Sequence, residues 1–182
     1  ISGLHAVQNY CRTNKISDNV LYVKKNRIST FEPLNISSYW CRFNLKLEQE
    51  LDATDPDVEY FLQNWNTKMK TFRYKKRFSW ITPDKLFRYD FTLIKSSPLT
   101  PRGDLKKYRN FQDANILSQD YMFEIEMELL SEKARKLKVE TESIATKFLK
   151  YFGYLLKSWQ GMPVIISKTD IHNVLEEYTA LT

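Results

Sequence analysis

The sequence predicts an α+β protein in which antiparallel strands come first and helices last. Eleven Tyr and eleven Phe stand against only four Gly, a balance typical of packed strands rather than of linkers. Between residues 20 and 130, polar and apolar side chains alternate with the two-residue period of strands. After residue 131 the apolar side chains recur every three or four positions, which is the period of an amphipathic helix. The length of 182 residues fits one domain, so we treat residues 1–182 as a single domain.

Turn signals divide the first part of the chain into separate strands. The predicted strands cover residues 20–31, 39–51, 71–80, 86–95 and 121–130. The run Thr82-Pro83-Asp84-Lys85 is a turn signal, so the two strands that flank it are predicted to form a hairpin. Residues 52–57 are predicted to form a loop, followed by a short helix over residues 58–66.

Residues 96–120 contain no strand or helix pattern. They are polar and basic, with a cluster of Lys106, Lys107 and Arg109. A segment of this length without secondary structure is typical of a functional or mobile loop. We therefore expect a mobile basic loop or a partly ordered insertion.

The C-terminal helices are predicted to occupy residues 131–182. The first should begin after Ser131 as N-cap and end at Gly161, which interrupts the apolar period. A second should begin near Ser167 and Asp170, which have the spacing of a capping box. One face of each helix is apolar, so we expect the helices to pack against strands.

Composition excludes several classes of protein. Two cysteines, Cys11 and Cys41, cannot form a disulfide framework, and His5 and His172 lie too far apart in the chain for an obvious zinc site. No stretch approaches the roughly 18 consecutive apolar residues of a membrane span, so no membrane partner is expected. The net charge of +6 suits an anionic partner such as nucleic acid, nucleotide or polyphosphate. The four tryptophans are expected to pack in the core or against strands rather than to stack on bases.

Charges of one sign gather on single strand faces. Alternation places Arg73, Lys75 and Arg77 on one face of their strand, and the next strand presents Arg88, Asp90 and Thr92 together. A later strand presents Glu124, Glu126 and Glu128 on one face. In the simplest interpretation each polar face is solvated, as in many half-buried sheets. However, like charges about 7 Å apart along a strand repel each other, so faces of opposite charge are more stable when they meet.

A barrel closed with these faces inward would bring the opposite charges together. Three inward carboxylates would then offer the oxygen ligands that Mg²⁺ and Mn²⁺ prefer. The facing Arg and Lys side chains would bind phosphoryl oxygens and stabilise charge that develops in phosphoryl transfer. The pattern therefore indicates a barrel with a charged interior.

Three ordered motifs resemble a known family. They are Arg73-Tyr74-Lys75-Lys76-Arg77-Phe78-Ser79, Arg88-Tyr89-Asp90-Phe91-Thr92 and Glu124-Ile125-Glu126-Met127-Glu128. Together they resemble the strand motifs of the metal-dependent RNA triphosphatases of the triphosphate tunnel family. The greatest likeness is to the triphosphatase domain of mRNA capping enzymes from large DNA viruses such as mimivirus and African swine fever virus. Segments 23–27 and 166–178 also resemble that group, so the likeness covers most of residues 20–182.

The resemblance implies a fold and an activity. The fold is an eight-stranded antiparallel β tunnel with helices packed outside it. The activity is that of an mRNA 5′-triphosphatase, which hydrolyses the γ-phosphate of 5′-triphosphate RNA in the first step of mRNA capping. Guanylyltransferase and methyltransferase domains are then expected on the same polypeptide. The expected location is viral, in the host cytoplasm or the virion.

The resemblance also implies roles for individual residues. Glu126 and Glu128 resemble ligands of a Mg²⁺ or Mn²⁺ ion, with Glu124 beside them in the same motif. The residues that resemble phosphate contacts are Arg73, Lys75, Arg77, Arg88 and Lys46. Asp90 and Thr92 match the Asp-x-Thr of the second motif, and we expect them to orient the cations.

The chain departs from the family pattern at one point. The family's metal site also uses a Glu-x-Glu pair on the first strand, and the only candidate here is Glu48-Gln49-Glu50. The context of that run resembles a later strand, so Glu48 and Glu50 are the weaker metal candidates. We expect the first strand of the native polypeptide to precede Ile1, and the chain to continue past Thr182.

Two other functions remain open from the residues alone. The same tunnel could act on nucleoside triphosphate, inorganic triphosphate or polyphosphate in place of RNA. Without the first Glu-x-Glu, the protein could instead be a non-catalytic module that binds triphosphate or RNA. Metal-dependent release of phosphate would separate catalysis from binding.

Overall fold

The computed structural model describes residues 1–16, 19–28 and 34–181. The chain divides into two compact units. Unit 1 consists of Ile1–Lys25, Glu48–Thr82 and Arg88–Glu128, and unit 2 consists of Asn26–Leu47, Pro83–Phe87 and Leu129–Thr182. Each unit is therefore built from three separate stretches of the chain.

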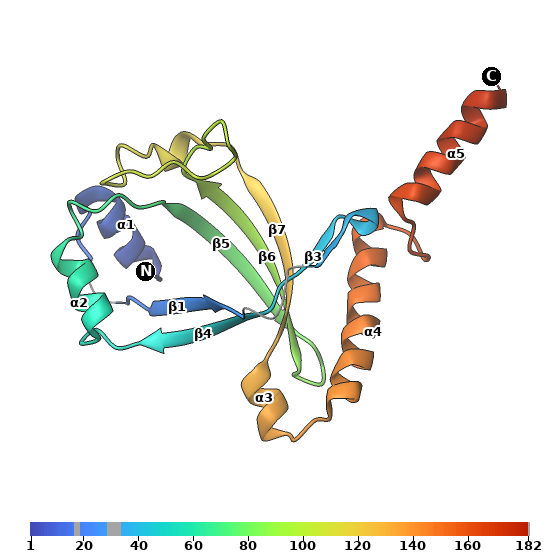
Figure 1. The fold of residues 1–182 in the computed structure, drawn as a ribbon, viewed down its shortest axis with the longest axis horizontal. Helices are drawn as coiled ribbons and strands as arrows, with labels where there is room; N and C mark the ends of the chain where they lie inside the picture. The colour runs from blue at the N-terminus through green and yellow to red at the C-terminus, as the bar shows by residue number, and fades with distance from the viewer. Residues whose placement is uncertain (17–18, 29–33, 182) are drawn as a thin grey trace. The chain divides into compact units, whose positions relative to one another are not determined.

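As predicted, the described strands lie between residues 22 and 129 and the C-terminal part of the chain is helical, but one helix also precedes the strands and another lies among them (Figure 1). The strands are β1 (Tyr22–Arg27), β2 (Leu34–Ile36), β3 (Cys41–Phe43), β4 (Lys46–Leu51), β5 (Arg73–Ile81), β6 (Phe87–Ser96) and β7 (Met122–Leu129). The α-helices are α1 (Leu4–Thr13), α2 (Pro56–Gln63), α3 (Ser131–Lys136), α4 (Thr141–Gln160) and α5 (Lys168–Leu181). Two 3-10 helices are η1 (Ser37–Tyr39) and η2 (Ile116–Ser118). Helix α1 has no counterpart in the sequence-based prediction.

The described strands form three small antiparallel sheets, none of them closed. Strand β1 pairs with β4, β2 pairs with β3, and the third sheet has the order β5-β6-β7. The prediction of an eight-stranded tunnel is therefore wrong for the described residues. A closed barrel needs a hydrogen-bonded neighbour on both edges of every strand, and among the described strands β5 and β7 each have one neighbour only.

The predicted hairpin is confirmed. β5 pairs antiparallel with β6, and the register places Arg77 opposite Thr92 and Ser79 opposite Asp90. Strand β7 adds to the other side of β6 (Figure 1). The charged motifs of the sequence thus lie on three adjacent strands of one open sheet.

Two predicted strands differ from the structure near the N-terminus. The segment 39–51 is interrupted at Asn44 and Leu45, so that it forms η1, β3 and β4 in place of one strand. The predicted strand 20–31 is present as β1, and the end of its predicted range lies outside the described residues.

The helical tail is divided where the sequence predicted one long helix. Lys138 has a left-handed backbone, with φ of 51°, and the Val139 amide donates to the carbonyl of Ala134. This is the type of hydrogen bonding that ends helices, so α3 ends at Lys136 and α4 begins at Thr141. Leu130, rather than Ser131, is the N-cap of α3.

Other helix boundaries agree with the prediction. Gly161 ends α4 in the left-handed conformation that favours glycine, with φ of 65°. The capping box before α5 is formed on both sides. The Asp170 amide donates to Ser167 Oγ at 3.1 Å, and the Ser167 amide donates to the Asp170 carboxylate at 2.8 Å. These hydrogen bonds lower the pKa of Asp170.

The core of unit 1 is aromatic. Its buried members are Tyr10, Phe72, Phe111, Ala114 and Ile116. Three of these belong to the segment 96–120, which therefore supplies core side chains besides its basic ones. Two backbone hydrogen bonds between Tyr108 and Lys70 join this segment to the residues that precede β5.

A second aromatic cluster stabilises unit 2. Phe148 and Phe152 of α4 stack on each other with ring centres 6.0 Å apart, and Phe43 of β3 contacts both rings. Phe87 is fully buried and packs on Phe148 and on Tyr151. The apolar face of α4 is thus covered by aromatic residues of its own unit. Within the described ranges, no helix is long and apolar enough to cross a membrane.

Candidate functional site

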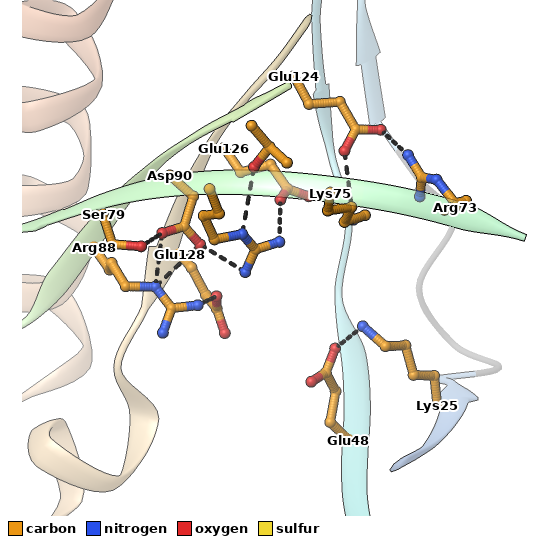
Figure 2. A network of polar contacts seen from close by, with 12 residues as sticks. Lys25, Glu48, Arg73, Lys75, Ser79, Arg88, Asp90, Glu124, Glu126 and Glu128 are labelled. Carbon is orange, nitrogen blue, oxygen red and sulfur yellow. Dashed lines mark hydrogen bonds and ion pairs between the residues drawn. The ribbon is translucent and has the colours of Figure 1, made fainter. Parts of the chain in front are cut away.

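One face of the β5-β6-β7 sheet contains eight of the eleven residues that the sequence proposed for the site (Figure 2). They are Arg73, Lys75 and Arg77 on β5, Arg88 and Asp90 on β6, and Glu124, Glu126 and Glu128 on β7. Four cations and four carboxylates therefore share one surface of unit 1. We call this surface the charged face.

The outer strands of the sheet exchange ion pairs across the central strand. Arg73 lies 2.6 Å from Glu124, and Arg77 lies 3.4 Å from Glu126. These arginines lie on β5 and the glutamates on β7, and β6 lies between them. The backbones of β5 and β7 are therefore about 10 Å apart. Arginine is long enough to bridge that gap. Lys75 joins the first pair at 3.7 Å from Glu124.

At the bridge from Arg77 to Glu126, the residue of β6 opposite Arg77 is a short one. Thr92 lies opposite Arg77 in the register, and its hydroxyl oxygen accepts a hydrogen bond from Arg77 Nε at 3.3 Å. A larger side chain at this position would block the path from β5 to β7. The Asp-x-Thr motif thus supplies the contact to a cation that the sequence analysis expected of it.

Asp90 is the most buried member of the charged face, with 1% of its surface exposed. Its carboxylate accepts a hydrogen bond from Ser79 at 2.5 Å and lies 3.1 Å from Arg77 and 3.0 Å from Arg88. Arg88 also reaches Glu128 at 2.6 Å. One buried carboxylate therefore orients two guanidinium groups, which agrees with the orienting role that was expected for it. The contact from Ser79 was not assigned from the sequence.

Lys75 differs electrostatically from its neighbours. Burial lowers the pKa of Lys75, and the positive charges of Arg73 and Arg77 lower it further. The carboxylates of Glu124 and Glu126 oppose that shift. A phosphate group bound beside Lys75 would favour its charged form for the same reason.

The glutamates of β7 are each engaged by a cation rather than gathered around a common point. Among the described residues, no three Asp, Glu, His or Cys side chains lie together as a group that could hold a metal ion. Carboxylate oxygens are nevertheless the donors that Mg²⁺ and Mn²⁺ prefer. The residue types fit such an ion, and the side chains of Glu124, Glu126 and Glu128 would have to leave their cations to hold it.

The three remaining candidates lie on β4, apart from the ion pairs of the charged face. Glu48 forms an ion pair with Lys25 of β1 (Figure 2). Glu50 and Lys46 are exposed, and neither forms an ion pair within the described part of the chain. The contact between Glu48 and Lys25 was not predicted, although Lys25 lies in segment 23–27, which carries part of the resemblance.

The comparisons with known proteins leave the chain without an assigned family. No family model matches it, and no curated protein or solved structure matches it either. Its function must therefore be argued from the site.

Proposed function

We propose that the protein is a metal-dependent mRNA 5′-triphosphatase, which hydrolyses the γ-phosphate of 5′-triphosphate RNA. The observation that supports this proposal most is the interleaving of four cations with four carboxylates on the charged face. A triphosphate with a divalent cation has the complementary pair of charges. The phosphate oxygens would take the Arg and Lys side chains, and the cation would take the glutamates.

The side chains of the charged face can exchange their ion pairs for contacts to phosphate and metal, because opening these ion pairs costs little free energy. Arg73, Glu124 and Glu126 are each at least one third exposed. Ion pairs of this kind contribute only about 0 to 1 kcal/mol, so they are readily opened. When metal and triphosphate bind together, the Arg and Lys side chains gain phosphate oxygens and the glutamates gain the metal ion. Each released side chain would therefore have a new partner of opposite charge.

The residues of the charged face would divide the chemistry between them. Arg77 and Arg88, held from below by Asp90, would bind phosphoryl oxygens and stabilise the charge that spreads over them as the terminal phosphate leaves. Arg73 and Lys75 would hold the remaining phosphates. A divalent ion held by Glu124, Glu126 and Glu128 would polarise a phosphoryl oxygen and lower the pKa of a bound water.

The test is metal-dependent release of phosphate from 5′-triphosphate RNA. We expect release with Mg²⁺ or Mn²⁺ and none with chelator. Glu126→Gln and Glu128→Gln should each abolish it at limiting metal while leaving the free energy of unfolding nearly unchanged, because exposed ion pairs contribute little to stability. Glu177→Gln, an exposed position on α5, is the matched control and should retain full activity.

A non-catalytic triphosphate-binding module is the second candidate, and one observation favours it. The glutamates of the charged face are not grouped around a common point among the described residues. Tripolyphosphate that binds to the wild type, with no phosphate released under any divalent metal, would decide for this alternative. Faster release from nucleoside triphosphate or tripolyphosphate than from RNA would instead indicate a nucleotide or polyphosphate phosphatase.

A further inference from the structure

The opposite face of the β5-β6-β7 sheet is aromatic and basic. Strand alternation places on it every second residue of the three strands, the ones between the members of the charged face. None of these residues is Asp or Glu along the whole of the three strands, all of which are described. All acidic side chains of this sheet therefore lie on the charged face. We call this second surface the aromatic face.

Large aromatic rings on this face are left in solvent. Trp80 is 56% exposed and Phe123 is 70% exposed, and Phe78 and Phe91 are also exposed. Phe78 and Phe91 lie directly opposite each other in the β5–β6 register. Trp80 meets the Phe91 ring edge to face, with ring centres 6.2 Å apart. Adjacent strands hold these rings in one array, in which every ring is at least 41% exposed.

Two lysines lie among the rings. Lys76 Nζ is 5.5 Å from the centre of the Phe78 ring, and Lys95 Nζ is 4.4 Å from the centre of the Tyr121 ring. Lys95 also donates to the Leu117 carbonyl oxygen at 2.6 Å, which holds it in place. Positive charge is thus distributed within the aromatic array, and the strands provide no carboxylate beside it.

We propose that the aromatic face binds single-stranded nucleic acid. Bases would stack on Trp80, Phe78, Phe91 and Phe123, and the phosphates would contact Lys76 and Lys95. The charge of the face favours this occupant over a protein segment, because the face presents cations only and a nucleic acid is a polyanion whose bases are flat aromatic rings. A single strand is required because the base faces of a duplex are already stacked. The proposal goes beyond the triphosphatase activity and does not depend on it.

The test measures binding of a labelled oligonucleotide that has a 5′-hydroxyl end. An oligouridylate of about 12 nucleotides, which is within the range of site sizes for such surfaces, has no terminal triphosphate to occupy the charged face. Its deoxythymidylate counterpart distinguishes RNA from DNA. Stacking contributes about 1 to 3 kcal/mol per base, so we expect Trp80→Ala and Phe91→Ala each to weaken binding at least about fivefold. Trp80→Phe keeps a ring and should retain most of the affinity.

The controls use positions away from the aromatic face. Trp159→Ala removes an exposed ring on α4, and Lys136→Gln removes an exposed charge on α3. Both should bind as the wild type does. Lys76→Gln should reduce the slope of log K against log salt by about 0.7, the value for one phosphate contact on a single strand. Tripolyphosphate at constant ionic strength should not displace the oligonucleotide.

Several results would overturn the proposal. One is equal affinity of the wild type and Trp80→Ala, when circular dichroism shows both to be folded. Another is displacement of the oligonucleotide by tripolyphosphate, which would place binding on the charged face. A third is self-association of the wild type that Phe91→Ala abolishes, which would make the aromatic face a contact between copies of the chain. Binding of this oligonucleotide, together with no metal-dependent phosphate release from 5′-triphosphate RNA, would refute the triphosphatase alone.

Discussion

Arg77 and Asp90 form an ion pair that joins the exposed and the buried parts of the charged face. The guanidinium nitrogen Nη1 of Arg77 lies 3.1 Å from the Asp90 carboxylate, which is 1% exposed, while the arginine is 36% exposed. The same arginine contacts Glu126 with its other terminal nitrogen. A buried anion thus fixes the orientation of a cation whose other side is available to solvent.

Loss of the Asp90 charge should weaken both the fold and the site. Asp90→Asn keeps the shape but removes the anion that holds Arg77 and Arg88, so we expect the free energy of unfolding to fall by about 1 to 3 kcal/mol. The two arginines are partly exposed and can regain water, which keeps the loss below that of a fully buried pair. Urea denaturation measures the change. Asp104→Asn, at an exposed position in unit 1, should leave stability unaltered.

Orientation by Asp90 also has a functional consequence under the proposed activity. The Asp90→Asn variant should bind tripolyphosphate more weakly under conditions where it is fully folded, because Arg77 and Arg88 are then no longer held in one geometry. Wild-type affinity in the folded variant would show that Asp90 stabilises the sheet without positioning the arginines.

Replacement of Arg77 by lysine should impair phosphate release although the charge is kept. Arg77 contacts Asp90, Glu126 and Thr92 at once through a planar group, and a lysine ammonium cannot reproduce that geometry. We expect Arg77→Lys to lower kcat/KM at least about tenfold, which is about 1.4 kcal/mol of transition-state stabilisation. Steady-state phosphate release is the measurement. Arg102→Lys, at an exposed loop position, is the matched control, and an equal loss in both variants would contradict the assignment.

The core of unit 1 should lose stability at alkaline pH through one tyrosine. Burial raises the pKa of Tyr10 from 10.0 to about 12. Since the folded-state pKa is the higher one, the stabilising contribution is complete below pH 10.0 and is lost as the pH rises to about 12. The difference is on the order of 1 to 3 kcal/mol.

The matched variant Tyr10→Phe isolates this effect. It keeps the ring that contacts Trp65 and Phe111 edge to face but has no hydroxyl to ionise. We expect its free energy of unfolding to decline less than that of the wild type over the same pH range. Parallel declines in denaturant titrations at several pH values would show that Tyr10 does not ionise on unfolding.

The sequence predicted local features of this chain well. Alternation along β5, β6 and β7 placed the charged residues on common faces, and the turn at residues 82–85 predicted the hairpin. The capping box at Ser167 and Asp170 was found for the same reason, because each feature depends on residues close together in the chain. Helix α1 was missed, and the helix break at Lys138 was missed because it depends on a single residue in the left-handed conformation.

The exposure of the aromatic residues could not be predicted from their identity. Trp80, Trp40 and Trp159 were expected to pack in the core or against strands, and all three are exposed. Trp65 is half-buried beside Tyr10, as expected for a core residue. Whether a ring on a strand is covered depends on which distant segment lies over it, and the period of the strand contains no information about that segment.

The sequence by itself determined which side chains share a strand face, because alternation is a property of the extended backbone. It also indicated that strand faces of opposite charge would meet. Only the tertiary structure decided how they meet. Like-charged strand faces can be neutralised inside a closed barrel or by side chains that reach across the surface of an open sheet, and both arrangements satisfy the same sequence pattern. In this chain Arg73 and Arg77 reach over β6 to the glutamates of β7, so the charges are paired on an open sheet. On the other side of that sheet the rings of Phe78, Trp80, Phe91 and Phe123 remain exposed.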